Sequence, residues 1–387
     1  LSAVYNLGFG WIGDPAVKMA YPEFGMKVTT VNGQSVDGNS ISFKALEKIT
    51  VEGEVLDASG QLVTDFTGIV NPTVKDSKVT VTCLKNSNKD DSPAFTFTDY
   101  PNTIFIGNDS VRNGKFSFTF TVPKDISYSN LQGKMNLYAV DTESGNEAQG
   151  NFDNFIVGGT SDTAETDTIG PEIRALYLND TTFVDGGQVN TTPYFVAELW
   201  DKSGVNITGS SVGHDMMLVI DESTVLSYNL NSYYELLPGE DGTGIVKFPI
   251  PALEPGKHTA EFWVWDILNN STVRTFTFEV VEGLKPFLFD VIATPGIARE
   301  QVTFHLMHNR PESRMRVGII VYDLAGRQLW KHEESGTSGL FENYTVSWDL
   351  TSGGARMRPG VYIYRAAIST DNSKDATKAR KFIILGE

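Results

Sequence analysis

The stretch "GIIVYDLAGRQLW", residues 318–330, is the strongest fold signal in this sequence. A strand-forming run enters Asp323-Leu324-Ala325-Gly326-Arg327, and an apolar strand resumes behind it. Asp-x-x-Gly between two strands favours a type I turn followed by a glycine in the left-handed conformation. Because side chains alternate along a strand, one face of the first strand should be buried, namely Met315, Val317, Ile319 and Val321. The stretch therefore predicts a β-hairpin with an apolar face and a polar turn.

The same period-2 alternation recurs along the chain, and Gly, Asn, Asp and Pro break it every 8–12 residues or so, as is typical of antiparallel sandwiches. Examples are "KITVEGEVLD", "KFSFTFTVP", "MNLYAVD", "PYFVAELWD", "TAEFWVWD", "VRTFTFEVVEG" and "GVYIYRAAIS". Tyr344, Val346 and Trp348 share a strand face in the same way. We therefore predict an all-β protein made of tandem immunoglobulin-like antiparallel β-sandwich domains.

Composition places the domain boundaries. The segment "TSDTAETDTI" is polar and should be an exposed linker, and "VEGLKPF" marks a second break. The first two modules both contain an aromatic strand closed by Asp, which we interpret as a weak internal repeat. Leu1 stands where an initiator Met is expected, so the chain should begin inside a larger protein. The expected parts are residues 1–26 as the tail of a preceding domain, a sandwich at 27–159, a linker at 160–168, a sandwich at 169–282 and a final sandwich at 285–387.

The net charge of −17 is unevenly distributed. From Leu284 onward there are 14 Lys and Arg against 11 Asp and Glu, which leaves 17 against 37 in the rest of the chain. An acidic body argues against nucleic acid and against anionic lipid as partners. No run of apolar residues is long enough for a membrane-spanning helix.

Catalytic chemistry finds little support in the sequence. Cys83 is the single cysteine, and its place in "VTVTCLKN" predicts a buried or half-buried strand residue. The spacing of the histidines matches no zinc or nucleophile motif, and we expect them on the surface: His214, His258, His305, His308 and His332. No catalytic and no metal-ligating residue is therefore assigned.

Acidic pairs in loops allow one possible cofactor, a calcium ion. Asp90-Asp91 and Glu240-Asp241 could hold Ca²⁺ through carboxylate oxygens, although solvated turns explain them better. No other cofactor is expected. Paired carboxylates of a glycosidase cannot be recognised from the sequence of a β protein, because the partners come from distant strands.

Two tryptophans give the strand "EFWVWD" two apolar faces. Trp263 and Trp265 share one face, and Phe262 and Val264 share the other. Either a neighbouring domain covers the indoles, or they form a surface that stacks on sugars or docks a protein.

The last hundred residues resemble the C-terminal sorting domain of type IX secretion substrates. The matching segments are "FDVIATPGIAREQVTFHL", "VYDLAGR", "VSWDL", "PGVYIYRA" and the basic final strand "KARKFIIL"; Gly296 departs from the usual Asn. The preceding segments "GPEIRALYLND" and "FWVWDILNNSTVRTFTFEV" resemble the gingipain-related sortases of that system. "YNLGFGWIGDPAVKMAYP" resembles the end of their cysteine peptidase domain.

This resemblance implies the C-terminal portion of a cell-surface sortase, located at the extracellular face of the outer membrane. Such a sortase is a cysteine transpeptidase that removes sorting domains from cargo and links the cargo to anionic lipopolysaccharide. Its catalytic Cys and His would belong to the peptidase domain, so this chain itself should not be an enzyme. The implied partners are an outer-membrane β-barrel protein of the PorV type and other components of the attachment complex.

The docking surface should then lie on edges and turns of the final domain, and we assign it to Asp323, Arg327, Gly360, Tyr362 and Lys381. Arg327 could equally pair with Asp323 alone. In the linker, Thr163 and Thr168 resemble O-glycosylation sites of exported proteins, or belong to a merely polar hinge. The alternative function is a secreted adhesin or carbohydrate-binding cargo protein, with the two indoles as its glycan platform.

Overall fold

The computed structural model describes residues 21–84, 93–162, 167–209, 213–237, 242–370 and 373–386. The chain divides into two compact units, residues 1–165 and 166–387. The described part consists of strands, turns and one short 3₁₀ helix, Asn231–Tyr233. The prediction of an all-β protein is confirmed. None of the helical residues described forms a segment long and apolar enough to cross a membrane.

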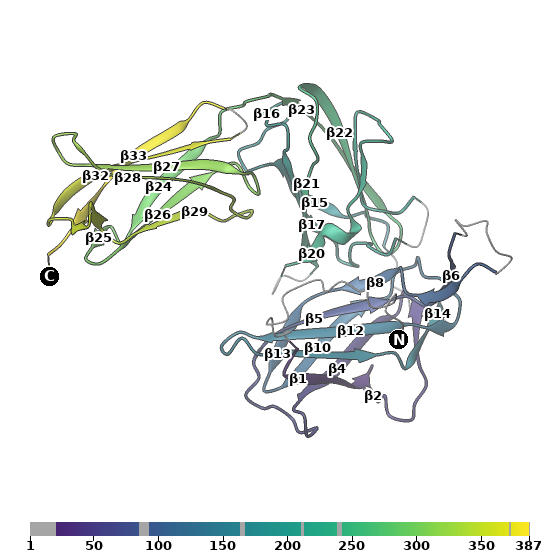
Figure 1. The fold of residues 1–387 in the computed structure, drawn as a ribbon. Coiled ribbons are helices and arrows are strands. Elements are labelled where there is room, and N and C mark those ends of the chain that lie inside the picture. Colours follow the sequence, from purple (N-terminus) through teal and green to yellow (C-terminus); the bar gives the residue numbers. More distant parts are fainter. Residues whose placement is uncertain are drawn as a thin grey trace, which may run out of the picture. The chain divides into compact units, whose positions relative to one another are not determined.

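The first unit is built around a large sheet whose strands follow the order β12-β13-β1-β4-β10-β9-β5-β8. Strand β12 also pairs with β5 over eight residue pairs, so the hydrogen bonding closes this sheet on itself. A smaller sheet, β11-β14-β3, and a separate hairpin, β6-β7, complete the described part of the unit (Figure 1). The bounds are β1 (Phe24–Val31), β2 (Gln34–Ser35), β3 (Ile41–Ala45), β4 (Lys48–Leu56), β5 (Gly68–Lys75), β6 (Val79–Thr82), β7 (Thr96–Asp99), β8 (Thr103–Ile106), β9 (Asp109–Arg112), β10 (Lys115–Thr121), β11 (Leu131–Gln132), β12 (Lys134–Asp141), β13 (Glu147–Phe152) and β14 (Phe155–Thr160).

Alternation of side chains explains the core of this unit. Strand β10 reads KFSFTFT, and its three phenylalanines are buried while the residues between them are exposed. The rings of Phe105 and Phe120 stack at 4.8 Å between centroids. Burying such rings supplies most of the driving force for closing the sheet.

The second unit begins with a two-layer sandwich, the middle domain. A four-stranded sheet, β15-β17-β21-β20, faces a five-stranded sheet, β16-β23-β22-β18-β19. The layers meet where Phe195 of β17 contacts Phe262 of β22, with ring centroids 5.0 Å apart. The bounds are β15 (Glu172–Leu178), β16 (Gln188–Val189), β17 (Tyr194–Trp200), β18 (Met217–Ile220), β19 (Ser227–Asn229), β20 (Tyr234–Leu236), β21 (Thr243–Pro249), β22 (Gly256–Trp265) and β23 (Ser271–Val280).

A second sandwich, the final domain, follows in the same unit. A three-stranded sheet, β24-β26-β29, faces a five-stranded sheet, β25-β33-β32-β27-β28. Phe304 of β26 contacts Tyr364 of β32 at 4.8 Å between centroids. The bounds are β24 (Leu288–Thr294), β25 (Ile297–Ala298), β26 (Val302–His308), β27 (Met315–Tyr322), β28 (Gln328–Gly336), β29 (Tyr344–Trp348), β30 (Thr351–Ser352), β31 (Ala355–Arg356), β32 (Gly360–Ser369) and β33 (Ala376–Ile384).

The middle and final domains share one topology. In each, a short strand near the start pairs in parallel with the last strand, β16 with β23 and β25 with β33. In each, the five-stranded sheet has the same order along the chain. The repeat suggested by the sequence for the first two modules is also present as a local hairpin. Strand β12 pairs with β13 and β22 with β23, and the Asp that follows or ends the first strand, Asp141 or Asp266, accepts hydrogen bonds from the turn.

The hairpin at residues 318–330 forms as predicted. Strand β27 pairs with β28 along its length, and its inward side chains Met315, Val317, Ile319 and Val321 have no exposed surface. Tyr344, Val346 and Trp348 are also buried, as predicted. The hairpin is thus central to the core of the final domain.

Candidate functional sites

The turn between β27 and β28 is held by its own side chains. The Asp323 carboxylate accepts hydrogen bonds from the backbone N–H groups of Ala325 (3.0 Å) and Arg327 (2.8 Å). The Arg327 Nε donates to Asp323 Oδ2 at 2.7 Å. These contacts with Arg327 hold the pKa of Asp323 below its ordinary value. Gly326 has a φ of +81°, the left-handed conformation expected of this turn. Asp323 and Arg327 therefore face each other, and the Arg327 side chain remains 79% exposed.

The other three residues assigned to docking lie in different environments. Tyr362 is 7% exposed, and its hydroxyl donates to the Arg358 carbonyl at 2.7 Å, so its ring belongs to the core. The assignment of this ring to a surface overlooked that β32 alternates inward at Tyr362 and Tyr364. Gly360 is half-buried at the start of β32, and Lys381 is exposed on β33.

The basic final strand divides its cations between two faces. Arg380 makes a bidentate contact with the Asp290 carboxylate, at 2.9 and 2.8 Å from Nη2. The Lys378 ammonium donates to the Phe289 carbonyl. Both therefore fasten β24 to β33. Lys381 points to the opposite side, since neighbouring residues of a strand alternate.

The two indoles of β22 lie on the outer face of the five-stranded sheet in the middle domain. Trp263 and Trp265 are half-buried, while Phe262 and Val264 on the inner face have no exposed surface. Cross-strand partners of Trp263 are Met217 and Val273. The Trp263 Nε1 donates to Glu261 Oε2 at 3.3 Å.

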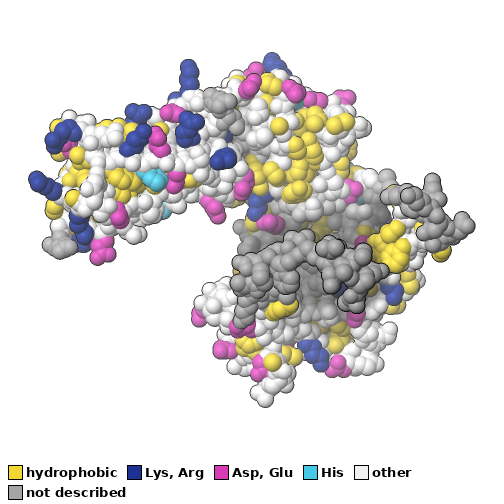
Figure 2. Space-filling model, in the orientation of Figure 1, with side chains coloured by type: hydrophobic (Ala, Val, Ile, Leu, Met, Phe, Trp, Pro, Cys, Tyr) yellow, Lys and Arg dark blue, Asp and Glu magenta, His cyan; other side chains and the backbone are white. Residues whose placement is uncertain are grey.

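Trp265 is covered on one side by a histidine ring. His214 lies 4.5 Å from the Trp265 ring, measured between centroids. In the space-filling view, apolar side chains gather on the middle domain, in the area where Figure 1 places β22 and β23 (Figure 2). The indoles are thus neither fully buried nor free, and part of each remains available for contact.

Three carboxylates converge at one end of the middle domain, where the sequence indicated no site. Asp201 follows β17, Asp266 follows β22, and Asp167 precedes β15 in the chain. One oxygen of each lies within 4.8 Å of the others. Asp201 and Asp266 are 4% and 0% exposed. The sequence held a signal, since "ELWD" and "WVWD" both end a strand in Asp, but only the tertiary structure brings the two ends together.

Each buried carboxylate also closes a turn. Asp201 Oδ1 accepts hydrogen bonds from Ser203 N, Ser203 Oγ and Gly204 N. Asp266 accepts from the backbone of Leu268 and from both nitrogens of Asn270. The Asn270 side chain also donates to the Asp167 carbonyl at 3.1 Å, which ties the start of the unit to this end.

Burial raises the pKa of Asp201 and of Asp266 above the ordinary value of 3.8. A neighbouring carboxylate adds to the effect in both, Asp167 for Asp201 and Asp201 for Asp266. Desolvation and like charge both disfavour the ionised form. Such a cluster can share a proton or hold a hard divalent cation through oxygen.

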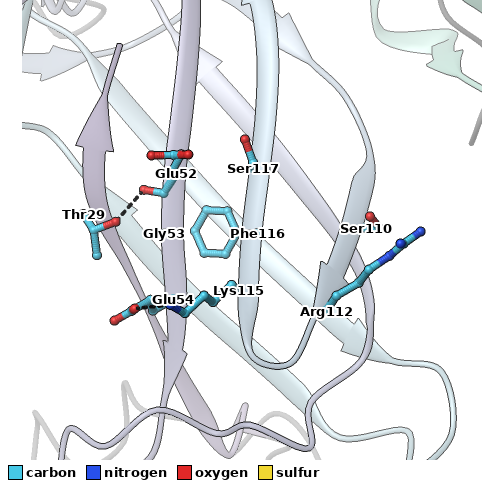
Figure 3. A pocket seen from close by; sticks show the side chains of 9 residues that line it. All are labelled: Thr29, Glu52, Gly53, Glu54, Ser110, Arg112, Lys115, Phe116 and Ser117. Atoms are coloured by element: carbon cyan, nitrogen blue, oxygen red, sulfur yellow. Dashed lines mark hydrogen bonds and ion pairs between the residues drawn. The ribbon is translucent and has the colours of Figure 1, made fainter. Parts of the chain in front are cut away.

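A shallow hollow of about 420 Å³ lies on the first unit (Figure 3). Strands β4, β9 and β10 and Thr29 of β1 line it, with charges from Glu52, Glu54, Arg112 and Lys115. Lys115 lies 3.7 Å from Glu54. A Cβ at Gly53 would come within 2.2 Å of the Phe116 ring, so glycine is needed for this close approach. The hollow is lined by two acidic and two basic side chains, and neither Cys nor His is among its lining residues.

Cys83 and the histidines differ from expectation. Cys83 is exposed and follows the end of β6, so the prediction of a buried strand residue was wrong. The alternation that suggested burial belongs to a two-stranded hairpin, β6-β7, that no second layer covers among the described residues. All five histidines are half-buried rather than on the open surface. His308 shows this most clearly, since burial and Arg310 lower its pKa to about 4.

Several predicted sites fall outside the described residues. These are the two acidic pairs, Asp90-Asp91 and Glu240-Asp241, and Thr163 of the linker. Thr168 is described and exposed. The division between the two compact units, after residue 165, falls within the stretch expected to be the linker.

Comparisons with known proteins gave results for solved structures alone. No protein-family model matches the chain, and no curated protein matches it. A tetra-tandem repeat from the extending region of a large adhesion protein is 14% identical and covers 94% of this chain and 74% of its own, with a TM-score of 0.20. The N-terminal Ig1-2 module of the Drosophila receptor tyrosine phosphatase DLAR is 10% identical and covers 57% of this chain and 100% of its own, with a TM-score of 0.23.

The crystal structure of dimeric latent PorU from Porphyromonas gingivalis is 38% identical over 97% of this chain, with a TM-score of 0.43. This chain spans 35% of that PorU chain. The identity therefore relates almost all of this sequence to a region that makes up about a third of PorU.

Proposed function

We propose that this chain is the non-catalytic C-terminal region of a cell-surface sortase of type IX secretion, related to PorU. The observation that carries the proposal is the identity of 38% with PorU over 97% of this chain. In the proposed parent protein, a cysteine peptidase domain outside this chain removes sorting domains from cargo and links the cargo to anionic lipopolysaccharide.

Within this proposal, the β-sandwich domains position the enzyme and the final domain docks it to an outer-membrane β-barrel protein of the PorV type. Two features support a scaffold and docking role. The residues that line the hollow and the carboxylate cluster include no Cys or His, and the final domain has its own core, formed by both of its sheets. A rigid domain with a preformed surface loses little entropy when it docks.

Docking can be tested with the purified chain and a PorV-type barrel protein in detergent, measured by biolayer interferometry. We expect saturable binding that a separately expressed middle domain, residues 167–282, does not compete away. Absence of binding by the whole chain, with its fold verified by circular dichroism, would refute the docking role.

A second function has one observation in its favour. The half-buried indoles of Trp263 and Trp265 lie on an outer sheet face beside Met217 and Val273, where sugar rings could stack. This would suit a carbohydrate-binding cargo protein. Glycan-array binding that Trp263→Ala abolishes would favour it over the sortase proposal, and an array without signal would dismiss it.

A further inference from the structure

The outer face of the five-stranded sheet in the final domain carries an exposed apolar row. Ile297 of β25 pairs with Ile383 of β33, and Ile383 pairs with Val361 of β32. Their exposed fractions are 55%, 36% and 40%. Directly paired residues lie about 4.5–5.5 Å apart at Cβ and form a continuous surface. A contiguous row of exposed apolar side chains indicates an interaction site.

The neighbouring rows of this face mix apolar side chains with cations. The next row runs from Lys381 through Ile363 to Tyr322. The row after it contains Arg365 and Ile320, followed by Lys331 of β28. We call these two rows, together with Ile297, Ile383 and Val361, the outer face.

The cations of the outer face are mostly unused within the domain. Lys331 pairs with Glu333 at 2.8 Å. Arg365 and Lys381 have no acidic partner among the described residues. Their neighbours in sequence, Lys378 and Arg380, are by contrast engaged on the other side of the strand. Figure 2 shows Lys and Arg side chains gathered along the final domain.

Two chemistries could match such a face, a protein surface or an anionic membrane. Binding to a membrane surface relies on bulky side chains that enter the acyl boundary, with Trp and Phe common among them. The apolar residues of the outer face are β-branched, apart from a single Tyr, and lie on paired strands. An apolar row beside uncompensated cations is better matched by a protein surface with carboxylates around an apolar centre.

We propose that the outer face is the docking surface of the final domain and that its partner is a protein that presents an acidic, partly apolar patch. This inference rests on the proposed docking function and deepens it. The proposed contact surface is therefore the outer face of the sheet and not the turn Asp323–Arg327, where Asp323 and Arg327 form an ion pair with each other. Complementary charge accelerates association, and the apolar row slows dissociation.

The test compares variants of the whole chain for binding to the PorV-type barrel protein in detergent. Arg365→Glu combined with Lys381→Glu should weaken binding by about tenfold or more and should remove its salt dependence. Val361→Thr, which keeps the side-chain shape and adds a hydroxyl, should raise the dissociation rate. Arg314→Glu is the matched control, because Arg314 is an exposed cation of the same domain outside the outer face.

The outcomes separate this inference from the docking proposal. If the unaltered chain does not bind, the docking function fails. If it binds and all variants bind equally, docking stands and the outer face is overturned as its site. If the unaltered chain binds phosphatidylglycerol vesicles, and the outer-face variants lose this binding as much as they lose binding to the barrel protein, the outer face is a lipid-binding face. That result would also overturn the inference. Unchanged circular dichroism and melting temperature of each variant establish that the fold is intact.

Discussion

Asp201→Asn should stabilise the middle domain at neutral pH. The Asp201 Oδ1 accepts three hydrogen bonds, from Ser203 N at 2.8 Å, Ser203 Oγ at 2.6 Å and Gly204 N at 2.9 Å. An asparagine keeps that oxygen and replaces the other one by an amide. The amide carries no charge, and it lies beside the carboxylates of Asp167 and Asp266. A repulsive contact is thus removed while the turn is preserved.

The size of the effect follows from the spacing. Two unit charges 4.8 Å apart repel by about 3.5 kcal/mol at an effective dielectric constant of about 20. Asp167 is half-buried, so solvent and salt reduce this figure, and we expect a gain of about 1–2 kcal/mol in the free energy of unfolding. The measurement needs a chelator, because a divalent cation bound by the three carboxylates would cancel the repulsion.

The raised pKa of Asp201 determines how the stability gain from Asp201→Asn changes with pH. Because the folded pKa of Asp201 is raised, its protonated form is favoured in the folded state. Its contribution to stability is therefore complete below the ordinary value of 3.8 and is lost as the pH rises through the folded pKa. The gain from Asp201→Asn should accordingly be small at pH 4 and largest at pH 8.

Hydrogen exchange of peptides from residues 194–280, followed in urea at both pH values, measures this gain in the middle domain itself. Asp57→Asn is the matched control. In "DASG" at 57–60, as in "DKSG" at 201–204, the aspartate accepts hydrogen bonds from the N–H and the hydroxyl of the serine two positions later. In the first segment, however, the hydrogen bonds from Ser59 and Gln61 lower the pKa of Asp57. That variant should not stabilise the first unit. An Asp201→Asn protein no more stable than the original at pH 8 would refute the reasoning.

Two further predictions concern the other domains. Hydrogen bonds from the backbone of Ser144, Thr67 and Glu143 lower the pKa of Asp141 to about 2. The stability that Asp141 contributes is therefore present above pH 3.8 and is lost as the pH falls toward 2. In the Asp141→Asn variant, the stability of the first unit should depend less on pH between pH 5 and pH 2, as monitored by circular dichroism. Tyr364→Phe should lower the free energy of unfolding of the final domain by about 1–3 kcal/mol, measured in urea, because the buried Val291 carbonyl loses the hydroxyl that donates to it at 3.0 Å. The control is Tyr138→Phe, whose hydroxyl lies at the surface. An effect of Tyr364→Phe no larger than that of the control would contradict this role.

The strands themselves could be read from the sequence. "GVYIYRAAIS" is β32 to the residue, and "KFSFTFTVP" contains β10, which ends at Thr121, because alternation along a strand is a local property with a period of two. The turn at Asp323–Arg327 could also be predicted from the sequence, since its hydrogen bonds join residues no more than four positions apart.

The surfaces were harder to predict. Tyr362 was assigned to docking and lies in the core, whereas Ile297, Ile383 and Val361 form an exposed row. Alternation tells which residues share a face, but it does not tell which face a second layer covers. That depends on how the sheet of β24, β26 and β29 packs against the sheet that contains β32 and β33, and this packing joins distant parts of the chain.

The sequence by itself determined the strands, the turns and the all-β class, because each arises from interactions within a few residues. Only the tertiary structure decided what those elements do. "DASG" and "DKSG" contain the same contact between an aspartate and the serine two positions later, yet one aspartate has a lowered pKa and the other a raised one. The difference arises because the fold buries Asp201 beside the carboxylates of Asp167 and Asp266, which lie 34 and 65 positions away in the sequence.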